Sequence, residues 1–303
     1  MSPQQISSDN LRGILLMIGA MACFALEDMF VKWAAVGLPT GQILLFLGFL
    51  GAPVFAALAA RRGSSFFSAT FWNPAVMARN AGEMIGTWGF ITALAVMPLA
   101  TISAIIQAMP LAVTFGAAVF LRETVGWRRW SAIGIGFVGV VIVVRPGADG
   151  FTTDAFWGLL AVAGLSARDL ATRSVPTRIS TFLLAAWGFA TAGVLGAGML
   201  AVSGGAVMPD PAQAGFLVGA LTFGIAGYWA ITAAMRVGEV ASVTPFRYAR
   251  LLFGLIIGWL VFAEPLQSAT IIGSVLIIGS GLYSFARERR LRQRALPIGG
   301  NAS

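Results

Sequence analysis

Three side chains that could bind an anion stand inside one long apolar stretch of the sequence: Arg247, Tyr248 and Arg250. A charged side chain at the centre of a lipid bilayer costs roughly 2.5–3.5 kcal/mol, so it must face a cavity or a partner. A guanidinium group binds a carboxylate through two parallel hydrogen bonds. We therefore expect one of these arginines to hold the carboxylate of a bound molecule. The alternative is a structural ion pair with Glu83 or Asp169.

A second polar face runs along an earlier apolar stretch. Asn80, Glu83 and Thr87 are three and four residues apart and share one side of a helix. We expect this face to contact the bound molecule, and an internal ion pair between Arg79 and Glu83 is the alternative. Glu83 is also the candidate proton carrier, because it is a carboxyl group set in apolar surroundings.

Another apolar stretch places Gln107 with Ser103, Pro110 and Thr114 at similar spacing, and we expect Gln107 to be a further contact of the bound molecule. Pro110, and Pro245 later in the chain, should each free a backbone carbonyl one turn earlier, which a ligand or a hydroxyl group could use. An ordinary helix kink is the alternative at each proline.

Similar residues recur along the chain at a constant step of 141 residues. Asp28 and Asp169 are one such pair (169 minus 28). The step also joins Lys32 to Arg173, Thr40 to Thr181, Gly86-Thr87-Trp88 to Gly227-Tyr228-Trp229, and Glu123 to Glu264. Two copies of one unit are therefore joined in this chain. Under this step Arg247 and Arg250 correspond to apolar residues of the first copy. The two copies therefore differ in charge, as recognition of an asymmetric molecule requires.

Trp88 and Trp229 are counterparts under this step, and Tyr228 stands beside the second. Both tryptophans lie away from the ends of their apolar stretches, so they do not fit the interfacial aromatic belt of a membrane protein. We expect these rings to form cavity walls suited to an apolar or aromatic group or to a cation. Plain packing between helices is the alternative.

Asp28 and Lys32, and their counterparts Asp169 and Arg173, have an acid four residues before a base. This spacing favours an ion pair on the surface of one helix. We expect both pairs to be structural or to act as gates at opposite faces of a membrane.

The composition requires lipid as the solvent for most of the chain. Of its 303 residues, 58% are hydrophobic and 11% are charged, against about 25% charged residues in a soluble domain. The net charge of +8 does not indicate nucleic acid, because the basic residues are divided among short loops and the C-terminal tail. With no histidine and a single cysteine, His/Cys metal sites and a disulfide within the chain are excluded, and no cofactor is expected.

We expect an all-α integral membrane protein whose ten transmembrane helices form two inverted five-helix repeats. A span needs about 20 mostly apolar residues. The expected helices lie at 11–33, 41–60, 75–97, 99–121, 128–145, 154–175, 180–203, 212–236, 240–262 and 266–285. The first repeat covers residues 1–149 and the second 150–286, and a basic tail at 287–303 touches anionic lipid.

Positive charge predicts the orientation, because Lys and Arg favour cytoplasmic loops. Most of the 20 basic residues fall on one side when the N-terminus is placed in the cytoplasm, so we expect both termini there. Since five is an odd number, the second copy crosses the membrane in the opposite direction to the first. Such halves can exchange conformations and open a central site to each side in turn.

This arrangement, with Leu121-Arg122-Glu123-Thr124 and Phe262-Ala263-Glu264-Pro265 after the fourth and ninth helices, resembles the EamA-type members of the drug/metabolite transporter superfamily. Within that superfamily the chain is similar to bacterial amino-acid exporters of the YddG kind. The resemblance covers almost the whole chain. It implies a bacterial inner-membrane protein with helices 1–4 and 6–9 around a central cavity and helices 5 and 10 at the periphery.

We therefore expect a transporter that exports small metabolites, above all neutral or aromatic amino acids, by alternating access. The mixed charges and the tryptophans suit a zwitterion with an apolar side chain. The alternatives are a transporter of anionic metabolites, such as phosphorylated sugars or nucleotide conjugates, and an uptake carrier. An enzyme is not expected, because no nucleophile stands with a paired base. The expected partners are the substrate and the lipid bilayer, with the protein a monomer or a homodimer.

Overall fold

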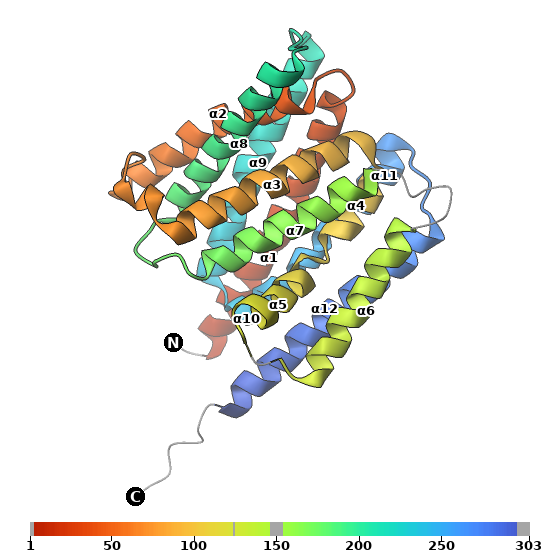
Figure 1. Cartoon of the computed structure of the whole chain (residues 1–303). Coiled ribbons are helices and arrows are strands. Elements are labelled where there is room, and N and C mark those ends of the chain that lie inside the picture. Colours follow the sequence, from red (N-terminus) through yellow and green to blue (C-terminus); the bar gives the residue numbers. More distant parts are fainter. Residues whose placement is uncertain (1–2, 124, 146–153, 296–303) are drawn as a thin grey trace, which may run out of the picture.

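The computed structural model describes residues 3–123, 125–145 and 154–295, and all regular structure in these ranges is helical (Figure 1). The expected boundary between the repeats, at 149 and 150, lies outside the described residues, as do positions 296–303 of the expected tail. The long helices of the first half are α1 (Pro3–Ala34), α2 (Thr40–Ala60), α3 (Pro74–Val96), α4 (Leu99–Ile106), α5 (Met109–Phe120) and α6 (Trp127–Val144). Those of the second half are α7 (Asp154–Thr172), α8 (Thr181–Ser203), α9 (Pro211–Val237), α11 (Ala249–Phe262) and α12 (Ser268–Ala295). Short helical turns complete the set: η1 (Ala69–Trp72), α10 (Val240–Val243) and η2 (Thr244–Tyr248).

Eight helical segments are long and apolar enough to cross a membrane within the described ranges. They are Asp9–Ala34, Thr40–Ala60, Leu99–Phe120, Trp127–Val144, Thr181–Ser203, Pro211–Val237, Thr244–Phe262 and Ser268–Arg287. The other two expected spans correspond to α3 and α7, which carry the charged residues of the interior and pack along each other. The start of α1 and the last turns of α12 lie at the same end of the bundle (Figure 1).

Residues with known capping preferences fix several helix starts. Asn73 precedes α3, where its side-chain oxygen accepts a hydrogen bond from the Ala75 backbone N–H at 3.0 Å. Asp210 and Gln213 form a reciprocal capping box at the start of α9. These polar contacts satisfy N–H groups that have no partner inside the helix.

Two of the expected spans are broken in the middle, at matching positions. The fourth is interrupted between α4 and α5 at Gln107 and Ala108, and the ninth contains the 3₁₀ turn η2 before α11 begins. Pro110 and Pro245 each stand second in the segment after a break, where a missing N–H removes no helical bond. The breaks meet in space, because the Gln107 side chain donates a hydrogen bond to the Arg247 carbonyl at 3.4 Å.

The helices pack chiefly in four pairs: α1 with α9, α2 with α8, α3 with α7, and α6 with α12. In Figure 1 the α6–α12 pair lies at one margin of the bundle and the α2–α8 pair at another. Under the 141-residue step α1 corresponds to α7 and α3 to α9. The α1–α9 and α3–α7 pairs are therefore counterparts of each other.

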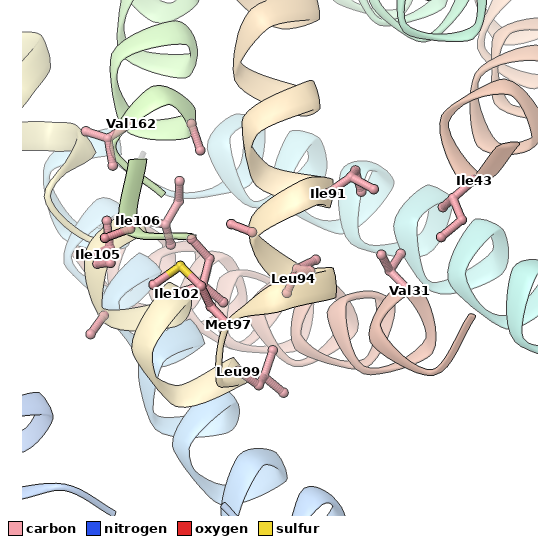
Figure 2. Packing of buried hydrophobic residues seen from close by; sticks show 14 of the residues in the cluster. Val31, Ile43, Ile91, Leu94, Met97, Leu99, Ile102, Ile105, Ile106 and Val162 are labelled. Carbon is pink, nitrogen blue, oxygen red and sulfur yellow. The ribbon is translucent and has the colours of Figure 1, made fainter. Parts of the chain in front are cut away.

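The largest buried apolar cluster surrounds the junction of α3 and α4. Leu94, Leu99, Ile102 and Ile105 are fully buried there, and Figure 2 shows them beside residues of α1, α2 and α7. Lipid tails are as apolar as leucine, so such clusters stabilise the fold through close packing rather than through removal from water.

Small residues allow the paired helices to approach backbone to backbone. A methyl group added at Gly48 of α2 would overlap the backbone of Gly193 in α8, and one added at Gly164 of α7 would overlap the backbone of Gly86 in α3. Glycine is required at such positions by the distance between the helices.

We predict that Gly48→Ala lowers the free energy of unfolding of the detergent-solubilised protein by about 1–3 kcal/mol, because α2 and α8 must separate. Gly198→Ala, on the same helix pair, is the matched control, since nothing lies within 4 Å of its added methyl group. It should be neutral or stabilising by about 0.5–1 kcal/mol. Equal effects of the two substitutions in a thermal unfolding assay would contradict this packing.

Candidate functional site

A cavity of about 280 Å³ opens between α1, α5, α7, η2 and α12, next to the two helix breaks. Its apolar wall includes Met21 and Phe24 of α1 and Pro110 of α5. Its polar lining consists of Gln107, Thr114, Asp169, Arg173, Thr244, Arg247, Tyr248, Arg250 and Ser284. Concave sites that combine apolar walls with a few placed polar groups are typical of small-molecule binding.

Arg250 is committed to a structural partner at the edge of this cavity. Its guanidinium group donates three hydrogen bonds to the Asp28 carboxylate, at 2.7, 2.8 and 3.1 Å. Asp28 is 3% exposed, and the Phe24 and Phe90 rings lie 5.3 and 5.2 Å from the guanidinium carbon. Arg250 therefore forms an ion pair, which was the alternative to a substrate contact, but its partner is Asp28. The two partners expected for it, Glu83 and Asp169, bind Arg168 instead.

Arg247 is the uncommitted cation of the cavity. It belongs to η2, its side chain is exposed, and it has no salt-bridge partner in the part of the chain that the structure describes. Its own backbone carbonyl is held by Gln107. The 3₁₀ turn thus fixes the backbone of Arg247 and leaves the guanidinium group available to a ligand.

Glu83 lies outside the cavity lining, in a charged network between α3 and α7. Arg79 binds it at 2.8 Å, and Arg168 at 3.2 Å. Arg168 also binds Asp169 at 2.7 Å, so charges alternate along the network as far as the cavity wall. The internal pair between Arg79 and Glu83, given above as the alternative to a substrate contact, is formed.

The three expected aromatic wall residues also lie away from this cavity in the described structure. The Trp88 ring packs 5.3 Å from Trp157, and Trp229 is 56% exposed on the outside of α9. The Tyr228 ring packs against Phe55, and its hydroxyl group donates to a backbone carbonyl of α8 at 3.2 Å. The packing alternative therefore describes their contacts. The aromatic rings that line the cavity belong to Phe24, Tyr248 and Phe285.

The ion pairs expected within α1 and α7 are replaced by pairs between the two halves of the chain. Lys32 binds Glu264 at 3.5 Å, and its counterpart Arg173 binds Glu123 at 2.9 Å. Each acid is 141 residues from the other, and so is each base. Spacing within one helix missed these contacts because the partners are distant in sequence.

The two counterpart pairs differ in how tightly they are enclosed. The side chains of Lys32 and Glu264 are 16% and 11% exposed, and those of Arg173 and Glu123 are 46% and 49% exposed. Lys32 also donates to the carbonyl of Met97 at 2.5 Å, at the end of α3. Glu264 accepts hydrogen bonds from the first two N–H groups of α4, at 2.8 and 3.2 Å.

The last helix, α12, lines part of the cavity. It corresponds to the expected helix 10, for which only a position at the periphery was expected. Gly281, Ser284 and Phe285 of α12 line the cavity, and the Tyr248 hydroxyl group lies so close to Gly281 that no larger residue fits there. Helix 10 thus reaches the cavity with these residues, although α12 packs chiefly with α6 at the margin of the bundle (Figure 1). The signal in the sequence was the run of small and polar residues along α12, from Ser274 to Ser284.

We predict that Asp28→Asn lowers the free energy of unfolding by about 3–5 kcal/mol, because it leaves the Arg250 guanidinium group without its counter-charge. Arg247→Gln should change stability by less than about 0.5 kcal/mol, because Arg247 has no such partner. Thermal unfolding in detergent measures both. A large loss for Arg247→Gln, or none for Asp28→Asn, would reverse the roles assigned to the two arginines.

Comparison with known proteins agrees with a membrane carrier. The sequence is 27% identical over 299 residues to a riboflavin transporter of Vibrio cholerae, covering 94% of this chain and 96% of that protein. It is 22% identical over 296 residues to an S-adenosylmethionine uptake transporter of Rickettsia bellii, covering 94% and 97%. It is 25% identical over 267 residues to the pseudopaline exporter CntI of Pseudomonas aeruginosa, covering 88% and 93%.

The fold is also known from experiment. A crystal structure that is 22% identical in sequence superimposes with a TM-score of 0.61 over 94% of this chain and 99% of the other. The EamA-like transporter family matches residues 11–145 and 153–285, which are most of the two halves. The chain therefore belongs to the EamA-like transporter family of the drug/metabolite transporter superfamily.

Proposed function

We propose that this membrane transporter carries a polar organic metabolite with a carboxylate or another singly charged anionic group, and binds it in the cavity beside Arg247. The observation that carries the proposal is the free guanidinium group of Arg247 among Gln107, Tyr248 and Thr114. Arginine donates two parallel hydrogen bonds to a carboxylate. The apolar wall at Met21 and Phe24 suits the less polar part of such a molecule.

The substrate class is broader than the amino acids expected from the sequence. The relatives are named for riboflavin, S-adenosylmethionine and pseudopaline, and they include both uptake and export. Their names do not support amino-acid export in particular. The proposed substrates are therefore a class of metabolites that includes amino acids, carried in either direction.

A phosphorylated substrate, the other alternative, is less well matched by these contacts. A phosphate ester carries nearly two negative charges at neutral pH and is held best by several cations. Arg250 is bound to Asp28, and Arg173 is bound to Glu123. One free guanidinium group fits a singly charged group better.

Alternating access between two inverted repeats is the proposed mechanism. It is supported by the correspondence of the α1–α9 and α3–α7 pairs, by the matched breaks at Gln107 and Tyr248, and by the two counterpart ion pairs. In the proposed cycle each ion pair closes one end of the path. The enclosed Lys32–Glu264 pair closes its end, and the cavity reaches Arg173 at the other.

The proposed topology has ten spans, with α3 and α7 crossing the membrane as well. Their charged residues neutralise each other in pairs, which removes most of the cost of placing them in lipid. Both termini are placed in the cytoplasm of a bacterium, because most basic loop residues then lie inside. In that orientation Arg173 faces the cytoplasm, so the conformation described is open inward.

We predict that Arg247→Gln raises the half-saturating substrate concentration roughly 10- to 100-fold, since it removes charge-assisted hydrogen bonds. The measurement is uptake into liposomes of purified protein, with labelled S-adenosylmethionine and phenylalanine, which both carry a carboxylate, as probes. Arg236→Gln, an exposed arginine at the end of α9, is the matched control and should behave as the wild type. Unchanged uptake by Arg247→Gln, or no uptake of any probe by folded protein, would rule the proposal out.

A further inference from the structure

One carboxylate inside the bundle has no cation of its own. Glu27, Asp28, Glu83 and Asp169 all lie within the long helices, and the last three each bind an arginine. Glu27 is partly buried, and no hydrogen bond or ion pair to its side chain is formed among the residues that the structure describes. Three of the four acids are therefore neutralised and the fourth is not.

The surroundings of Glu27 leave its charge unmatched. Its carboxylate packs against Gly224 of α9, where an added methyl group would lie 2.7 Å from Oε1. The charged groups that face it are Asp28, beside it on α1, and Arg250 of α11, which Asp28 already holds through three hydrogen bonds. The Cys23 thiol lies one turn earlier on α1, while α3, α4 and η2 contact α1 without bringing a further charge to Glu27.

The other copy of the repeat shows what a neutral version of this interface contains. Under the 141-residue step Glu27 corresponds to Arg168, and Gly224 corresponds to Glu83. In the α3–α7 pair these positions hold a salt bridge of 3.2 Å. In the α1–α9 pair they hold an acid facing a glycine. One interface is thus neutral by itself, whereas the other has one negative charge in excess and no cationic side chain at the matching position.

We propose that Glu27 is a proton-binding site of the carrier, so that the charge of the α1–α9 interface changes from minus one to zero when a proton binds. A proton fits better than a metal ion, because no group of three potential metal ligands is present in the described ranges. Glu27 is next to Asp28, which binds Arg250, and Lys32 follows five residues later on the same helix. The Lys32–Glu264 ion pair closes one end of the proposed path. Proton binding therefore acts on the helix that must move when that end opens.

This proposal rests on the proposed transport function and assigns its coupling ion. It also replaces Glu83, the carboxyl group expected from the sequence to carry a proton. Glu83 is held by two guanidinium groups, and Thr87 donates to it at 3.3 Å, so its negative charge is already matched.

The test is an infrared titration of the purified protein in lipid, from alkaline to mildly acidic pH, with no substrate present. A carboxylic acid that gains a proton in apolar surroundings gives a carbonyl stretching band separate from those of the ionised groups. We expect this band in the wild type and in Glu83→Gln, and its loss in Glu27→Gln, which is isosteric and does not titrate. Glu27→Asp should restore the band at a shifted frequency, because the acid is kept and only its position changes.

An unchanged band in folded Glu27→Gln, or a band lost in Glu83→Gln instead, would overturn the proposal. If Glu27→Gln does not fold, the spectrum of Glu27→Asp is the deciding result. A band that stays at the wild-type frequency in Glu27→Asp comes from another carboxyl group and contradicts the proposal. The titration needs no transported molecule. A failure of the Arg247 uptake experiment would therefore leave this result standing, and the two failures can be told apart.

Discussion

The structure depends on one constraint: a charge within an apolar bundle must meet an opposite charge or a polar ligand. Asp28 forms an ion pair with Arg250, and Glu83 forms ion pairs with both Arg79 and Arg168. These pairs hold α1 to α11 and α3 to α7, and so they set the positions of the helices around the cavity. Among the residues that the structure describes, Arg247 in the cavity and Glu27 at the α1–α9 interface are the charged groups of the bundle interior without such a partner. We propose that Arg247 binds the substrate and that Glu27 binds a proton.

Two ion pairs join the two halves of the chain, and the proposed transport cycle depends on them. Lys32–Glu264 and Arg173–Glu123 are equivalent contacts in the two copies, but one is enclosed and the other is open to its surroundings. In the proposed alternating-access cycle the two halves exchange these arrangements, so that the enclosed pair opens when the other closes. The breaks at Gln107 and Tyr248 interrupt the regular helical backbone where it lines a cavity, and membrane proteins tolerate irregular backbone in such places.

Periodicity predicted the segments well because it depends on local composition. Most of the long helices begin and end within a few residues of the expected limits, and the breaks fall near Pro110 and Pro245. The exceptions are α1, which begins at Pro3 where residue 11 was expected, and α12, which ends at Ala295 where residue 285 was expected. The partners of the charges were harder to predict. A spacing of four residues suggested Asp28–Lys32, yet helix packing brings Arg250 closer to Asp28 across 222 residues of sequence. The cavity wall at Gly281 was missed for the same reason, since a small residue shows what it accommodates only when its neighbour, Tyr248, is known.

The most direct test of alternating access is a pair of spin-label distances, one across each end of the path. Labels at Val36 and Leu266 report on the Lys32 end, and labels at Arg122 and Ser174 report on the Arg173 end, all at exposed positions. Glu264→Gln weakens the enclosed ion pair without touching the other. We predict that the distance at the Lys32 end then lengthens while the distance at the Arg173 end shortens. A change at one end alone, or lengthening at both, would contradict it.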